Sequence, residues 1–215
     1  MINTNYFDSR ALRFTDSYGQ RFMRSGTYHY HLIPAGAREM VADRPFTIET
    51  VESPKEHTMD QHTVLVNHES HAFRPDKPKL KIRVGDLIMW SCRQQSVPPF
   101  EVVGDQEFFG SASLVNECGY AHAFSAAGEY SWVDIFGSGL SGVIRVHDPK
   151  CQNKDDLAKW RQMLKKGTLV MIADGKAKPA EVEIVIGQTV YFAVVKTDGI
   201  SITDRRLVND STKKS

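Results

Sequence analysis

Apolar and polar residues alternate with a period of two over much of the chain, a pattern typical of half-buried β-strands. The clearest example is the stretch 128–146, GEYSWVDIFGSGLSGVIRV. Tyr130, Trp132 and Asp134 fall on one face of a strand, a glycine-rich turn follows, and 142–146 predicts a closing strand. Large aromatic side chains at alternating positions indicate that this face belongs to a core.

Residues 62–148 contain about seven segments of this kind, spaced as in an antiparallel sandwich. They include 62–68, two strands within 80–90 that meet at a Gly-Asp turn, and 100–103. We therefore expect 62–148 to form one complete Greek-key β-sandwich and the chain to be all-β.

The two ends of the chain repeat the halves of this central pattern in reversed order. Residues 168–204 follow the strands and turns that open 62–148, whereas 10–52 follow those that close it. Neither half could bury its apolar face alone. Two arrangements remain open: the ends close within one chain into a permuted second sandwich, or the C-terminal half of one molecule completes the N-terminal half of the next. The first is simpler because it needs no partner.

One segment, 153–167, has a helical period. Leu157, Trp160 and Leu164 form an apolar stripe, and Lys-Lys-Gly ends the segment, so we predict a connecting helix packed against a sandwich. The predicted division of the chain is a half-sandwich at 1–52, a linker at 53–61, the complete domain at 62–148, a linker with the helix at 149–167, a half-sandwich at 168–208 that pairs with 1–52, and a polar tail at 209–215.

The stretch 128–146 resembles the end of a cupredoxin, the blue-copper type of β-sandwich. In that family it reads Tyr-x-Tyr-x-Cys, then His, then Gly-Met-x-Gly-x-Ile-x-Val, and the Cys, His and Met bind copper with a second His. The resemblance places Phe100, Asp134, Gly137 and Leu140 at the four ligand positions. It therefore implies cupredoxin-like sandwiches without the type 1 copper ligands, whose pole is a packed plug or a contact surface. Asp134 should be hydrogen-bonded or reached by solvent there.

Composition sets modest limits on function. With 215 residues, 41% hydrophobic residues and a formal net charge of +1, the chain is typical of a soluble globular protein and suggests neither nucleic acid nor a membrane as partner. No signal peptide is visible, which favours a cytoplasmic protein or part of a non-secreted assembly. Three cysteines without CxxC spacing predict reduced thiols, and Cys92 with Cys118 is the pair expected if the chain were extracellular.

The sequence contains no GxSxG elbow, HExxH motif or phosphate-binding loop. We therefore expect the protein not to be an enzyme and to have no catalytic residue, no cofactor-binding residue and no cofactor. The predicted function is a metal-free cupredoxin-like binding or assembly subunit that works through contacts with a protein partner or by self-association.

Histidines supply the alternative function. His29 and His31 alternate on one strand with their side chains about 7 Å apart. His68 and His71 belong to a looser group in the linker and first strand that also contains His57, Met59, Asp60 and His62. If His29, His31, His68 or His71 bound copper as a cofactor, the chain would be a copper-binding or electron-transfer protein with non-standard ligands.

Overall fold

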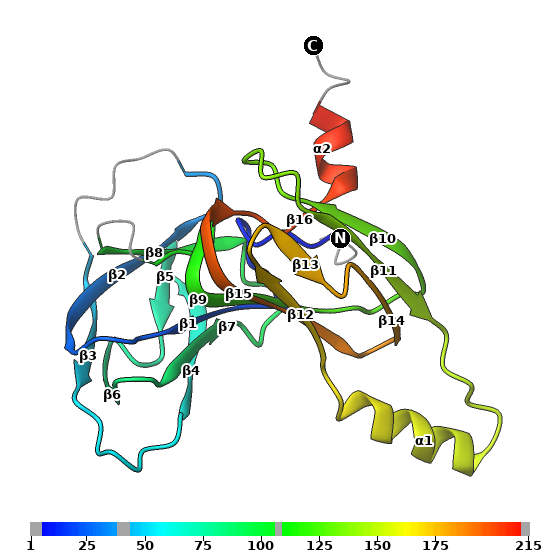
Figure 1. Ribbon diagram of the computed structural model, residues 1–215, viewed down its shortest axis with the longest axis horizontal. Helices are drawn as coiled ribbons and strands as arrows, with labels where there is room; N and C mark the ends of the chain where they lie inside the picture. Colours follow the sequence, from blue (N-terminus) through cyan, green and yellow to red (C-terminus); the bar gives the residue numbers. More distant parts are fainter. Residues whose placement is uncertain (1–5, 38–43, 106–108, 212–215) are drawn as a thin grey trace.

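The computed structural model describes residues 6–37, 44–105 and 109–211. Within them the chain is all-β with two helices, as the alternating pattern predicts (Figure 1). The strands of the first half are β1 (Asp16–Arg21), β2 (Gly26–Pro34), β3 (Phe46–Val51), β4 (Gln61–Glu69), β5 (Ala72–Pro75), β6 (Lys79–Arg83), β7 (Leu87–Ser91) and β8 (Phe100–Gly104). The second half comprises β9 (Leu114–Ala123), β10 (Gly128–Val133), β11 (Ser141–His147), α1 (Lys154–Leu164), β12 (Thr168–Ala173), β13 (Lys176–Lys178), β14 (Glu181–Val185), β15 (Thr189–Ile200), β16 (Thr203–Asp204) and α2 (Arg205–Ser211).

Three sheets organise these strands. The large sheet has the order β13-β12-β15-β9-β1-β7-β4-β5, and the two small sheets have the orders β6-β3-β2-β8 and β14-β11-β10-β16. Tyr30 of β2 contacts Trp90 of β7 with ring centroids 5.5 Å apart, and Trp132 of β10 contacts Phe192 of β15 at 5.4 Å. Each small sheet therefore packs on one half of the large sheet, and two sandwiches share one continuous sheet.

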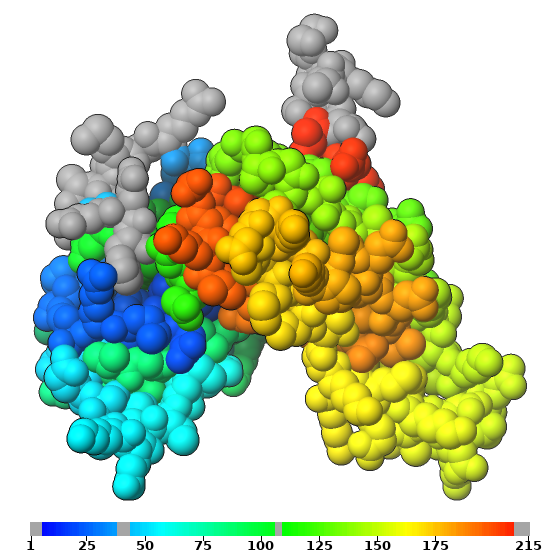
Figure 2. Space-filling model, viewed as in Figure 1, coloured from blue at the N-terminus to red at the C-terminus, as the bar shows by residue number. Residues whose placement is uncertain are grey.

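The two sandwiches are structural repeats, named here the first repeat (residues 7–105) and the second repeat (residues 109–208). Every strand pairing among β1–β8 has a counterpart of the same sense among β9–β16, as in the parallel pairs β3–β6 and β11–β14. The hydroxyl of Tyr28 donates to the Arg24 carbonyl at 3.0 Å, and the hydroxyl of Tyr130 donates to the Ala126 carbonyl at 2.9 Å. Figure 2 shows the repeats as two lobes, the first mostly blue to cyan and the second green to orange.

The repeats meet where β1 pairs with β9. The pairing is antiparallel and places Tyr18 opposite Tyr120 and Gly19 opposite Gly119. From this junction outward, the large sheet has the order β1-β7-β4-β5 on one side and the equivalent order β9-β15-β12-β13 on the other. A pseudo-twofold axis therefore passes through the junction. A buried polar network also crosses it: one carboxylate oxygen of Asp16 lies 2.6 Å from both the Tyr120 hydroxyl and Nδ1 of His122.

The strand pairing groups the halves differently from the predicted domains. Among the described residues, no strand from β4 to β8 pairs with β9, β10 or β11, so 62–148 does not form one complete sandwich. In the part of the chain described, no strand of 1–52 forms a ladder with a strand of 168–208, and their strand pairing is limited to the isolated bridge of Asp8 with Thr203. Each half instead joins its neighbour in sequence: 1–52 with 62–104, and 114–148 with 168–204. Consecutive elements are usually adjacent in space, and the chain follows that rule twice.

A short arm precedes each repeat's first strand and pairs with the other repeat. Ser9 donates its N–H to the Ile202 carbonyl at 3.0 Å and accepts from the Ile202 N–H through its hydroxyl at 3.1 Å. Ser111 makes the same two bonds to Val102, both at 3.0 Å. The repeats therefore exchange their arms about the pseudo-twofold axis.

The linker of the second repeat contains the predicted helix, α1. Asn153 caps it by accepting the Asp156 N–H at 2.9 Å, and the indole of Trp160 donates to the Ile186 carbonyl at 3.0 Å, which docks the helix on the end of β14. α2 begins before the predicted polar tail, of which 212–215 lie outside the described residues. Neither helix in the described residues has the length and apolar character needed to cross a membrane.

Candidate functional site

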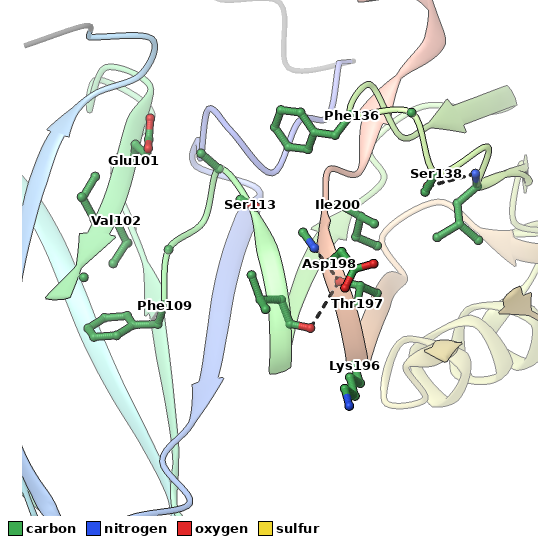
Figure 3. A pocket seen from close by; sticks show the side chains of 18 of the residues that line it. Glu101, Val102, Phe109, Ser113, Phe136, Ser138, Lys196, Thr197, Asp198 and Ile200 are labelled. Carbon is green, nitrogen blue, oxygen red and sulfur yellow. Dashed lines mark hydrogen bonds between the residues drawn. The ribbon is translucent and has the colours of Figure 1, made fainter. Parts of the chain in front are cut away.

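A cleft of about 1050 Å³ lies between the two repeats at one pole. In Figure 3, Glu101, Val102 and Phe109 line one side, whereas Phe136 and the 196–200 end of β15 line the other. Phe136 is 53% exposed although it is a large aromatic residue. Clefts at domain junctions are common binding sites, so this is the first place to test the predicted site residues.

Only two of the four positions at which the family resemblance places copper ligands line the cleft, and the four do not form one site, because Phe100 belongs to the first repeat and Asp134, Gly137 and Leu140 to the second. Phe100 is fully buried in β8, Leu140 is 7% exposed, and Gly137 has a positive φ of 98° in the loop after β10. Gly137 and Leu140 line the cleft, and none of its described lining residues is a His, Cys or Met. The lining offers carboxylates, Lys196 and backbone groups instead.

Asp134 holds the loop at this pole. Its carboxylate accepts backbone N–H groups of Phe136 at 3.1 Å, Ser138 at 2.9 Å and Ser201 at 2.8 Å. Burial acts to raise the pKa of Asp134, but these hydrogen bonds outweigh it and lower the pKa. Asp134 is thus an ionised cap that joins the loop to the strand after β15.

The pKa of Glu101 is shifted in the opposite direction from that of Asp134. Burial in the wall of the cleft raises the pKa of Glu101 to about 6, while the Arg10 guanidinium acts to lower it and Asp8 adds to the rise. A carboxyl of this pKa can hold a proton near neutrality. The cleft nevertheless lacks a His or Cys beside it among the described residues, so no nucleophile–base pair is formed there.

The four histidines predicted as alternative ligands do not form one of the groups of side chains close enough to share a metal ion in the described residues. His29 is exposed and His31 half-buried on β2, His68 packs on Phe73 with ring centroids 4.8 Å apart, and His71 has a positive φ in the β4–β5 turn. Among the described residues, the one group of three or more His, Cys, Asp or Glu side chains close enough to share a metal ion is His57, Asp60 and Asp86. None of the four predicted histidines belongs to it.

That group, extended by His62, surrounds the Gly-Asp turn between β6 and β7 and is named here the His–Asp cluster (His57, Asp60, His62 and Asp86). Asp86 is 1% exposed, and its two oxygens lie 2.7 Å from Nε2 of His57 and 3.0 Å from Nε2 of His62. The sequence signalled His57, His62 and Asp60 as a loose group. It signalled Asp86 only as a turn residue, since 24 residues separate it from His62.

All three cysteines are free. Cys92 and Cys118 are buried and do not form the disulfide considered for an extracellular chain, and Cys151 is exposed. Burial raises the pKa of Cys92 to about 11 and that of Cys118 to about 12. Neither buried thiol is therefore a reactive nucleophile at neutral pH.

The outer ends of the molecule present two unpaired strand edges. β6 ends one small sheet and exposes Lys79, Lys81 and Arg83, named here the basic edge. β14 ends the other small sheet and exposes Glu181 and Glu183, named here the acidic edge. The two strands hold equivalent positions in the repeats, because each pairs in parallel with its neighbour, β3 or β11.

No protein-family model, curated protein or solved structure matches this chain. The likeness to cupredoxins therefore remains a prediction based on the residues quoted from its sequence.

Proposed function

We propose that this protein is a non-catalytic assembly subunit with a cupredoxin-like sandwich in each repeat and no copper at the pole. Its copies join end to end, because the basic edge of one copy pairs with the acidic edge of the next. The observation that carries the proposal is the opposite charge of two equivalent, unpaired strand edges.

An edge strand has a row of backbone N–H and C=O groups that can pair with another strand. β6 hydrogen-bonds only to β3, and β14 only to β11, within the ladders of the described residues. In contrast, the edges at β8 and β16 are covered by the exchanged arms, through Ser111 and Ser9. Two edges of the small sheets thus remain open for a partner.

The charges on these edges select which edge pairs with which. Opposite charges across a strand pair stabilise it by about 0.2–1 kcal/mol each, and like charges destabilise it. Pairing of β6 with a second β6 would oppose Lys79, Lys81 and Arg83 to one another, and pairing of two β14 strands would oppose glutamates. Pairing of β6 with β14 is the combination that the charges favour.

The charges also have partners within the chain, but weak ones. Lys81 lies 2.8 Å from Glu49 and Glu181 lies 2.6 Å from Arg145, and their side chains are 63% and 62% exposed. Exposed ion pairs contribute little to stability, so these side chains can exchange partners at small cost. The basic residues of β13, Lys176 and Lys178, belong to the large sheet and not to the acidic edge.

The positions of the edges determine the kind of assembly. β6 and β14 lie toward opposite ends of the longest axis (Figure 1). A contact between two different surfaces at opposite ends of a molecule produces an open filament or a closed ring, not a simple dimer.

The test is a charge exchange followed by sedimentation velocity and light scattering. The wild-type chain should associate at low ionic strength and dissociate as salt screens the edges. Variant E181K/E183K has two basic edges and variant K79E/K81E has two acidic edges, so each alone should be a monomer. Mixed in equal amounts they should assemble, because each edge again finds an opposite one.

The control is R93E/K196E, which changes two exposed basic residues, one in the loop after β7 and one on β15, that belong to neither edge strand, and it should assemble as the wild type does. A wild-type monomer at every ionic strength, or a mixture of the two variants that stays monomeric, would overturn the proposal. Metal analysis of the same samples tests the alternative, copper bound by His29, His31, His68 or His71.

A further inference from the structure

The His–Asp cluster contains more ionisable side chains than are needed to cap the turn between β6 and β7. Each oxygen of the Asp86 carboxylate accepts one backbone N–H, from Asp60 at 2.9 Å or from Arg83 at 2.9 Å, and each also faces one imidazole Nε2, that of His57 or His62. Asp86 is 1% exposed, so a buried carboxylate with four polar partners lies at the centre of the cluster.

The second repeat shows what the fold itself needs at this position. Gln188 follows the equivalent turn, and its side-chain oxygen accepts the Val185 N–H at 2.8 Å, as Asp86 accepts that of Arg83. Its amide nitrogen then donates to the carbonyls of Met163 and Lys166 and holds the linker of that repeat. A neutral amide therefore suffices to cap the turn and hold a linker. The carboxylate with two imidazoles is an addition of the first repeat.

From this we infer that the His–Asp cluster is a binding site for one divalent transition-metal ion of the zinc type, held by His57, His62, Asp86 and Asp60. Nitrogen and oxygen ligands bind Zn²⁺ at about 2.0–2.2 Å, so ligand atoms of one ion lie roughly 3 Å apart. The Nε2–oxygen distances of 2.7 Å for His57 and 3.0 Å for His62 are close to that separation, but they run to different oxygens of Asp86, so the His62 side chain has to turn toward the ion. The ligand atoms of His57, Asp60 and Asp86 all lie within 4.8 Å of one another.

Charge and access agree with such an ion. As metal ligands, two carboxylates and two imidazoles together bring two negative charges, which a divalent cation balances. Asp60 is exposed and the His62 side chain is 28% exposed, so solvent reaches one side, whereas Asp86 and His57 form the buried side. In the metal-free network Nδ1 of His57 lies 3.5 Å from the Arg83 guanidinium, which has to turn aside when Nε2 becomes a ligand.

The ligand set also defines the chemistry. Two imidazoles with carboxylates and no thiolate or thioether suit Zn²⁺ or Co²⁺ and do not provide the sulfur ligands of a blue-copper centre. The ligands come from the 53–61 linker, from β4 and from the β6–β7 turn, so the ion would fasten the linker of the first repeat where α1 and Gln188 fasten that of the second.

The experiment titrates the untagged, metal-stripped chain with ZnCl₂ by calorimetry and with CoCl₂ by visible absorption, in a C151S background that removes the exposed thiol. We expect one ion per chain, a Co²⁺ spectrum of low coordination number, and a higher melting temperature with Zn²⁺. The H57Q/H62Q variant should lose at least about tenfold in affinity and lose the thermal shift. The control H29Q/H71Q removes two exposed histidines outside the cluster and should bind as the wild type does.

Failure of the parent chain to bind Zn²⁺ stoichiometrically, or binding that survives H57Q/H62Q, would overturn the inference. Equal loss of binding in H29Q/H71Q would do so as well. Should H57Q/H62Q fail to fold, D60N decides, because Asp60 is exposed: reduced affinity supports the site and unchanged affinity rejects it. Zinc binding and end-to-end association are separate readouts, so either can fail without the other.

Discussion

Replacement of Gly119 by alanine tests how tightly the two repeats are joined. Gly119 lies on β9 opposite Gly19 of β1, at the centre of the shared sheet. An alanine Cβ at Gly119 would lie 2.5 Å from the Tyr191 ring and 2.7 Å from the Phe192 carbonyl oxygen. That oxygen belongs to the backbone of β15, which is paired with β9 and cannot move without disturbing the ladder.

Gly19 provides the matched control. A Cβ there would lie 2.6 Å from the sulfur of Met89 and 3.1 Å from the hydroxyl of Tyr191, and both atoms are side-chain ends that can rotate away. Neither glycine has a positive φ, so backbone strain does not enter.

Overpacking a well-filled site costs about 1–3 kcal/mol, and the lower entropy of the unfolded alanine chain returns about 0.4–1 kcal/mol. We therefore expect Gly119→Ala to lower the free energy of unfolding by about 1–2 kcal/mol and Gly19→Ala by less than about 1 kcal/mol. Urea denaturation measures both, with an unchanged slope showing that only stability has altered. Equal losses, or a larger loss for Gly19→Ala, would refute the assignment of the Phe192 carbonyl as the rigid contact.

Three further predictions concern single side chains. The raised pKa of Glu101 means that its ionised form opposes folding, so the free energy of unfolding should fall as pH rises from about 4 through 6. Thermal denaturation should therefore show that Glu101→Gln is more stable than the wild type by about 1 kcal/mol at pH 8, after allowance for solvent screening, and equally stable at pH 4. The lowered pKa of Asp86 has the opposite sign: its contribution is complete above about pH 4 and is lost as pH falls, so Asp86→Asn should flatten the acid limb of a stability–pH curve. Tyr28→Phe and Tyr130→Phe remove equivalent hydrogen bonds, and each should lower the free energy of unfolding by about 1 kcal/mol in urea denaturation. A large difference between the two losses would argue against the equivalence of these two positions in the repeats.

The strands could be predicted from the sequence because each carries its own signal. The alternation of Tyr130 and Trp132 shows which side chains face a core, and both are buried. The signal of the helix is equally local, since the apolar stripe with Trp160 and the Lys-Lys-Gly end lie in one short segment. The half-patterns that recur at both ends of the sequence correspond in position to the strand pairings that the two repeats have in common.

Which half of the sequence pairs with which could not be predicted from the same alternating pattern. A period of two tells which face of a strand is buried but not which strand lies beside it, and both groupings of the halves bury the same residues. The complete His–Asp cluster could not be predicted for a related reason. Asp86 lies 29 residues from His57 in the sequence, and only the path of the linker brings the two side chains together.

The exchanged arms have a consequence for how such a chain could have arisen. Ser9 and Ser111 each complete the last strand of the repeat to which they do not belong. A single repeat with its own arm would therefore be left with an open edge, and two copies of it would cover that edge by swapping arms across a true twofold axis. The chain is what gene duplication and fusion of such a domain-swapped homodimer would produce, and cutting it between residues 105 and 109 should give two fragments that fold stably only together.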